Sequence, residues 1–166
     1  MINLVGYHGT TRIKASKIVE EKKYRLSSKS DEWLGEGVYF FKDKFWADNW
    51  AKSESAKLND APKVLRSSIE CAANEFFDLD SVDNKKKIEA SIKMFASHKS
   101  CDGAPNFKNE KESRCFYCNF YAKIENILVY SFNFPGGGYD SLGFPKSQVQ
   151  YCVRDNKIIK DTKILR

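Results

Sequence analysis

Three short stretches of this 166-residue chain carry side chains that could hold and act on a small molecule. The first is Tyr7-His8-Gly9-Thr10, and the second is Leu-Gly-Glu-Gly-Val-Tyr-Phe-Phe, which ends at Phe41. Trp50 follows the tyrosine of the second stretch by eleven residues, and the third stretch is Gln148 to Asp155. Taken alone, His-Gly-Thr is more often a turn, and Trp50 lies at helical spacing from Trp46, as a packing residue would. Their conjunction in one chain favours a functional interpretation.

In this order the three stretches resemble the His-Tyr-Glu class of ADP-ribosyltransferases, which includes poly(ADP-ribose) polymerases and diphtheria-type toxins. In that class a strand ends in His-Gly-Ser/Thr, a Gly-x-Gly-x-Tyr-Phe turn follows, and a late strand carries a Glu. The resemblance spans residues 7–155. It implies an α+β fold with a split, mostly antiparallel sheet, flanking helices, and an NAD cleft between the two halves of the sheet.

The resemblance also implies a role for each residue around NAD. His8 is expected to hydrogen-bond a hydroxyl of the adenosine-side ribose, with help from Thr10. Main-chain groups of Gly9 would hold the nicotinamide carboxamide, because a missing Cβ permits close approach. The rings of Tyr39 and Trp50 would sandwich the nicotinamide, although the family more often has Tyr at the second position. Indole offers a larger stacking face.

The departure from the family lies at Gln150, which occupies the place of the catalytic Glu. An amide can accept a hydrogen bond from a ribose hydroxyl, but it has no charge to offset the cation that develops when nicotinamide leaves. Three readings stay open: a slower transferase, an enzyme that uses another carboxylate such as Glu36, or a binding-only relative. Gln148, two residues earlier, occupies the position that addresses the target in related toxins.

The segment Pro135–Pro145 is rich in glycine and is predicted to be a loop. It carries Tyr139 and Phe144, and in the toxin relatives the loop before the catalytic strand recognises the acceptor. Exposed aromatic rings in a basic segment could stack on a nucleobase. A plain loop that tolerates glycine is the alternative.

We therefore predict an NAD-dependent mono-ADP-ribosyltransferase that modifies a macromolecular acceptor, either protein or nucleic acid. Small size and family habit suggest a bacterial toxin or phage-conflict effector, with a neutralising antitoxin as a further partner. The alternatives are an NAD glycohydrolase, in which water replaces the acceptor, and a catalytically inactive module that binds NAD or ADP-ribose.

Composition limits the setting of this chemistry. The net charge of +6 favours polyanionic partners, although it could serve solubility alone. Five cysteines, an odd and uneven set, argue against a disulfide framework. No signal peptide or membrane-spanning run is evident, so we expect one cytoplasmic domain over residues 1–166 with no membrane partner.

One histidine and three of the cysteines also allow a competing interpretation, a zinc site. His98-x2-Cys101 and Cys115-x2-Cys118 have the ligand types and spacings of a structural zinc site. The second pair, however, falls in a predicted aromatic-rich helix, where cysteine serves well as a small buried residue. We predict no metal.

The elements that must position these residues follow from hydrophobic periodicity. Strands are expected over residues 1–7, 37–41, 127–134, 148–155 and 157–165, with one or two more over 64–79. Helices are expected over residues 11–23, 81–97 and 113–126, and another after Asp43, which could cap it. This unequal mixture argues for α+β rather than a regular βαβ winding.

Overall fold

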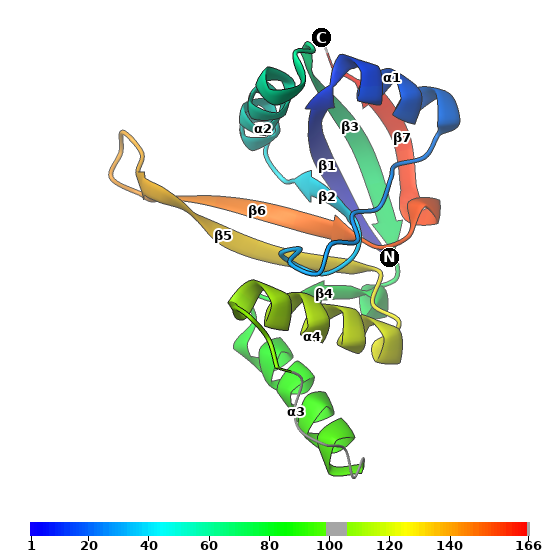
Figure 1. Cartoon of the computed structure of the whole chain (residues 1–166), viewed down its shortest axis with the longest axis vertical. Helices are drawn as coiled ribbons and strands as arrows, with labels where there is room; N and C mark the ends of the chain where they lie inside the picture. Colours follow the sequence, from blue (N-terminus) through cyan, green and yellow to red (C-terminus); the bar gives the residue numbers. More distant parts are fainter. Residues whose placement is uncertain (99–105, 166) are drawn as a thin grey trace.

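A computed structural model of the chain describes residues 1–98 and 106–165 and shows a mixed α+β architecture (Figure 1). The strands of the described residues form one seven-stranded sheet in the order β4-β5-β6-β2-β1-β3-β7. Among these strands of the described residues, only β4 and β5 pair in parallel. The α+β class and the mostly antiparallel sheet are thus confirmed. The strands are β1 (Ile2–Thr11), β2 (Val38–Phe41), β3 (Pro62–Cys71), β4 (Phe76–Asp78), β5 (Val129–Tyr139), β6 (Pro145–Val153) and β7 (Ile159–Ile164).

Helices cover the two ends of this sheet separately. Helices α1 and α2 pack on β1 and β3, whereas α3 and α4 lie together at the opposite end, near β4 (Figure 1). Among the described residues, no helix is both long and apolar enough to span a bilayer. The helices are α1 (Arg12–Glu21), α2 (Lys44–Leu58), α3 (Val82–His98) and α4 (Glu110–Glu125), with short 3-10 turns η1 (Ala73–Glu75) and η2 (Asn156–Ile158).

The side chains of β2 show how the sheet divides its core. Successive side chains of a strand point to opposite faces. Val38 and Phe40 join a buried cluster with Ala15 of α1, whereas Tyr39 packs against the cluster that includes residues of α4. Phe41 joins a third cluster, with residues of α2. The short strand β2 therefore lies among all three core clusters.

The glycine-rich segment differs from the prediction. It is not a loop throughout, because β5 continues to Tyr139 and pairs with Pro145 of β6. The pairing shifts register between Pro135 and Tyr139, and Gly137 and Gly138 adopt positive φ values of 72° and 70°, which glycine tolerates best. The two strands form a long arm that projects from the body of the sheet (Figure 1).

One other predicted boundary shifts, and one predicted cap is not formed. The first strand runs on to Thr11 rather than ending at Tyr7, because it pairs with β3 along its whole length. Asp43 does occupy the position before α2, but its side chain makes no capping hydrogen bond. The indole of Trp46, on the first turn of that helix, instead donates from Nε1 to the Ser147 carbonyl of the arm, 3.0 Å away.

Candidate functional site

The three sequence stretches lie on three neighbouring strands at the centre of the sheet, β1, β2 and β6. Tyr7 pairs with Phe41, Phe41 pairs with Gln150, and Gln150 pairs with Phe132 of β5. Paired residues of antiparallel strands share a face, so these four side chains form one row across the sheet. The residues are far apart in the sequence, and the fold brings them together.

His8 and Tyr39 meet where β1 and β2 separate. The strands are joined through the single registered pair Tyr7–Phe41, and the imidazole of His8 bridges them one step further on. Its Nδ1 lies 2.8 Å from the main-chain carbonyl oxygen of Tyr39. A carbonyl only accepts, so Nδ1 carries the proton, and in the neutral ring Nε2 is left as an acceptor.

Burial keeps the His8 ring neutral. The half-buried ring packs edge-on against Tyr24, with centroids 5.2 Å apart, and lies 5.8 Å from Phe40. Desolvation lowers the pKa of His8, Lys14 adds to this effect, and the hydrogen bond to Tyr39 opposes it. The site therefore offers a ring nitrogen that can accept a hydrogen bond from a hydroxyl.

Gly9 and Thr10 are both buried. A Cβ on Gly9 would overlap the Ala47 carbonyl oxygen and lie 2.9 Å from the Ala51 nitrogen. The glycine thus lets α2 lie directly on β1, a packing reason that the sequence did not reveal. Thr10 is 5 % exposed, and its main chain pairs with Lys63 of β3.

The Tyr39 hydroxyl is held by the turn that precedes β2. It donates to the Gly35 carbonyl at 2.7 Å and accepts from the Leu34 amide at 2.8 Å. Burial raises the pKa of Tyr39 well above its ordinary value, with the nearby Cys152 thiol adding to the rise. Because the hydroxyl is engaged twice and stays protonated, the ring can contribute through its face and not as an acid or base.

Two residues that sequence reasoning missed secure this turn. Asn119 of α4 accepts from the Glu36 amide at 2.8 Å and from Arg154 Nη1 at 2.9 Å. The same Arg154 nitrogen donates to the Glu36 carbonyl at 2.8 Å. Gly35 has a φ of 85°, which favours glycine. Arg154 lies in the third stretch and could have been noticed, whereas nothing in the sequence singles out Asn119.

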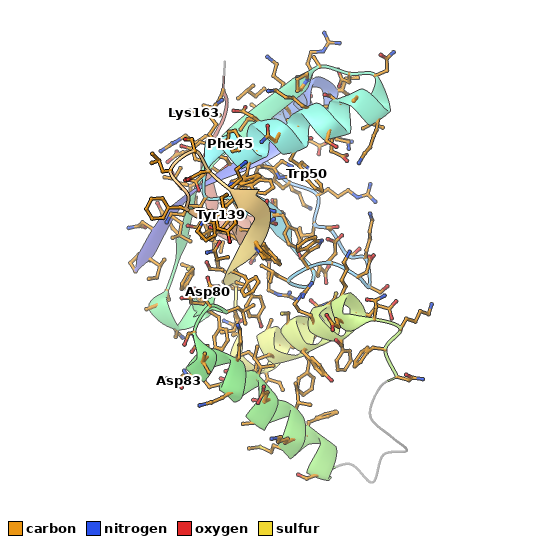
Figure 2. The ribbon with its side chains drawn as sticks, turned by 90° about the vertical axis from the view of Figure 1, so that its left-hand side faces the viewer. Phe45, Trp50, Asp80, Asp83, Tyr139 and Lys163 are labelled. Atoms are coloured by element: carbon orange, nitrogen blue, oxygen red, sulfur yellow. The ribbon has the colours of Figure 1, made fainter. Side chains whose placement is uncertain are left out.

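Trp50 lies on α2 with 53 % of its surface exposed (Figure 2). Its ring lies against that of Phe41, at 6.4 Å between centroids, and among the described residues no ring contact joins it to Tyr39. Tyr39 and Phe41 are two residues apart on β2, so their side chains point to the same face of the sheet. The nicotinamide sandwich between Tyr39 and Trp50 stays a prediction.

Gln150 is half-buried between Phe41 and Phe132, and within the described part of the chain its side chain makes no hydrogen bond. Its amide is therefore available to a ligand. Gln148, also half-buried, lies two residues further out on β6 and pairs with Phe134. Glu36 is exposed, and its main-chain amide and carbonyl make hydrogen bonds to Asn119 and Arg154.

Tyr139 and Phe144 lie at the tip of the arm, 69 % and 65 % exposed (Figure 2 labels Tyr139). Leu142 between them is 80 % exposed. The Asp140 carboxylate accepts from the amides of Leu142 and Phe144, at 2.8 and 2.9 Å. The tip is thus a tightly hydrogen-bonded turn that presents three large apolar side chains to solvent.

The zinc interpretation involves residues that the structure describes only in part. No group of three or more His, Cys, Asp or Glu side chains in residues 1–98 and 106–165 is arranged to hold a metal ion. Cys115 and Cys118 are buried free thiols of α4, and burial raises the pKa of Cys118 to about 12. Cys101 and the His98 side chain lie outside the described part, so the four-residue combination is not tested.

The hollows on the surface of the described chain include three beside its helices. One lies along α1, one between α2 and β3, and one between α3 and α4. None of the three is lined by His8, Tyr39 or Gln150. The NAD cleft between the halves of the sheet therefore stays a prediction.

Comparison with known proteins adds a distant likeness. The chain is 29 % identical, over 101 residues, to an uncharacterized protein of the archaeon Methanocaldococcus jannaschii. The match covers 59 % of this chain and 47 % of that relative, so it spans about half of the relative's length. No family model matches the chain, and no solved structure matches it.

Proposed function

We propose that this chain is an NAD-dependent mono-ADP-ribosyltransferase with an ADP-ribosyltransferase-like fold. The observation that carries the proposal is the arrangement of the three sequence stretches. They lie on adjacent strands, β1, β2 and β6, with His8 bonded to the main chain of Tyr39 and Gln150 one strand away. This is the grouping that the resemblance requires, from residues up to 142 positions apart (8 to 150).

The proposed chemistry divides the work between these side chains. The free Nε2 of neutral His8 would accept a ribose hydroxyl, and the fixed ring of Tyr39 would offer a face to the nicotinamide. Cleavage of the nicotinamide–ribose bond leaves positive charge on the ribose, which the enzyme must stabilise. The Gln150 carbonyl oxygen would align the 2′-hydroxyl and meet that charge with a dipole, not a full negative charge.

The acceptor would be a macromolecule that meets the arm. Tyr139 and Phe144 are exposed at its tip, and Gln148 lies on the same strand as Gln150, between it and the tip. Grouped apolar side chains on a surface often mark interaction sites. A partner that covers the tip would act as an antitoxin by blocking the acceptor.

The decisive experiment follows labelled NAD in the presence of cell lysate. We expect cleavage of NAD and transfer of label to a product that either protease or nuclease removes. Gln150→Ala should reduce cleavage by about 10- to 100-fold, the cost of one positioned hydrogen bond to a neutral group. Gln150→Glu should keep or raise cleavage, because it places negative charge beside the developing cation.

Other outcomes identify the alternatives. Cleavage without transfer to any macromolecule would make the protein an NAD glycohydrolase. An inactive wild type that binds NAD and gains turnover with Gln150→Glu would make it a binding module. If Gln150→Ala retained full activity, the assignment of Gln150 would be wrong, and if neither binding nor cleavage of NAD occurred, the proposed function would fall.

A further inference from the structure

The hollow between α3 and α4 combines apolar walls with a cationic rim. Its volume is about 550 Å³, within the 300–1,000 Å³ range typical of small-molecule sites. The walls come from both helices and from the sheet, and they include Leu34, Leu79, Ile88, Ile92, Tyr117 and Phe132. Such a space favours a ligand with an apolar body.

Three cations and one carboxylate line the same hollow: Lys85, Lys93, Arg114 and Glu89. Within the described residues, none of these three cations has a carboxylate within 4.0 Å. Other lysines of the chain do, including Lys86 of the same helix, which lies 3.9 Å from Asp83. The positive charge at the hollow is therefore left for a ligand to neutralise.

Two of the cations are held in place by neighbouring groups. Lys85 Nζ lies 5.2 Å from the centroid of the Phe132 ring, which is a wall of the hollow. Arg114 Nε donates to the Trp33 carbonyl at 2.7 Å, which fixes the guanidinium and leaves its terminal nitrogens available. An anionic group that enters here would meet oriented donors.

From these observations we infer that the α3–α4 hollow is a binding site for a small amphipathic anion. The ligand has an aromatic or acyl body between the helices and a carboxylate, sulfonate or phosphate at the rim formed by Lys85, Lys93 and Arg114. The site is separate from the proposed NAD chemistry and does not depend on it. Two of its lining residues adjoin that region: Phe132, which pairs with Gln150, and Leu34, whose amide bonds the Tyr39 hydroxyl.

Titration calorimetry with 1-anilinonaphthalene-8-sulfonate tests the inference without NAD. This probe should bind wild type once and saturably. The double variant Lys85→Gln/Lys93→Gln should weaken binding by about tenfold or more, because charged hydrogen bonds are lost. The control Lys86→Gln/Lys87→Gln makes the same change of charge on the same helix, at two lysines that do not line the hollow. Its affinity for the probe should stay within about twofold of that of wild type.

Two further measurements distinguish the contribution of the apolar walls to binding from that of the cationic rim. N-phenyl-1-naphthylamine has the same body without the sulfonate, and its binding should not distinguish the two double variants. Ile92→Trp should fill the half-buried wall and displace both probes while circular dichroism shows a folded chain. Equal sulfonate binding by both double variants would overturn the site, as would unchanged binding by Ile92→Trp. Sedimentation that showed a dimer broken by Ile92→Trp would make the hollow an interface between copies instead.

Discussion

At position 8 the structure gives a histidine three neighbours that together decide its charge state. The Tyr39 carbonyl accepts the Nδ1 proton, and the rings of Tyr24 and Phe40 exclude water from the sides. The carbonyl bond fixes the tautomer, and burial favours the neutral form. Nε2 of His8 can therefore accept a hydrogen bond only while the ring stays neutral, which links its proposed role to pH.

The stability of the fold should fall with His8 protonation. Burial lowers the pKa of His8 below its ordinary 6.5, so the unfolded chain binds this proton more readily than the folded chain. The contribution is fully present above pH 6.5 and is lost as pH falls below it, toward the lower folded pKa. Urea unfolding at pH 7.5 and 5.5 should show a smaller loss for His8→Gln than for wild type.

The chain has two histidines, so the imidazole signals that disappear from the NMR spectrum of His8→Gln belong to His8. Their titration should give a midpoint below 6.5. A midpoint at or above that value, or equal losses of stability in the two proteins, would contradict the burial argument. An NAD-binding assay over the same pH range should lose affinity as the ring takes up its proton, because Nε2 then becomes a donor.

Among the elements, the β5–β6 arm presents exposed aromatic side chains at its tip. Replacing Tyr139 and Phe144 together with serine should leave NAD cleavage in water within about twofold, since Gln150 lies at the base of the arm. Transfer to the macromolecular acceptor should fall by about tenfold or more, as expected when two aromatic contacts are removed from an interface. Labelled NAD with and without lysate measures both reactions.

Leu58→Ser/Ile124→Ser provides the matched control for the arm. These residues are 53 % and 52 % exposed, at the ends of α2 and α4, so the same kind of apolar surface is lost elsewhere. The control should retain transfer. If the arm variant also retained it, the acceptor would be recognised by another surface.

Hydrophobic periodicity predicted the helices and most of the strands, because each of them buries one regular face. Ile88, for example, is buried on α3 at the spacing expected of a helix. The arm was not predicted because Gly136, Gly137 and Gly138 have no side chains, so this segment shows no alternation of apolar and polar residues. Its strand structure depends on pairing with β6. The ring of Trp46 and the main chain of Lys146 approach Gly136 within 3.1 Å of where its Cβ would lie.

For the candidate site, the sequence identified candidate residues but not the groups to which they hydrogen-bond. That His8 would lie near Tyr39 followed from the resemblance, and the bond to the Tyr39 carbonyl depends on how β1 and β2 separate. The clamp formed by Asn119 and Arg154 joins a helix to a turn 83 positions away in the chain, from Asn119 to Glu36. Such long-range contacts leave no periodic signal in the sequence.

On the scale of the whole molecule, one sheet connects core clusters that have no residue in common among the described residues. The cluster beneath α1 contains Ala15 and Ile69, and the cluster beside α4 contains Leu34 and Tyr130. Strand β6 contributes to both, because Val153 belongs to the first and Cys152 to the second. The prediction of a single domain requires that this shared sheet transmit instability from one cluster to the other.

Ile69→Ala tests that requirement. Ile69 is fully buried, and its truncation should lower the free energy of unfolding by about 2 to 5 kcal/mol. Trp33 reports on the other cluster, since its ring lies 4.6 Å from Phe134. In a Trp46→Phe/Trp50→Phe background, the fluorescence of Trp33 should therefore shift to a lower urea midpoint when Ile69 is truncated, even though Ile69 is on β3.

The far-ultraviolet circular dichroism of the same samples should show a coincident transition, because one cooperative unit loses its helices and its tertiary contacts together. Ile164→Ala, 38 % exposed on the edge strand β7, is the control and should shift both signals only slightly. If Trp33 kept its midpoint while circular dichroism showed an earlier partial loss, the α1–α2 and α3–α4 ends would unfold separately. The chain would then behave as two units built on one sheet, and the single-domain prediction would be wrong.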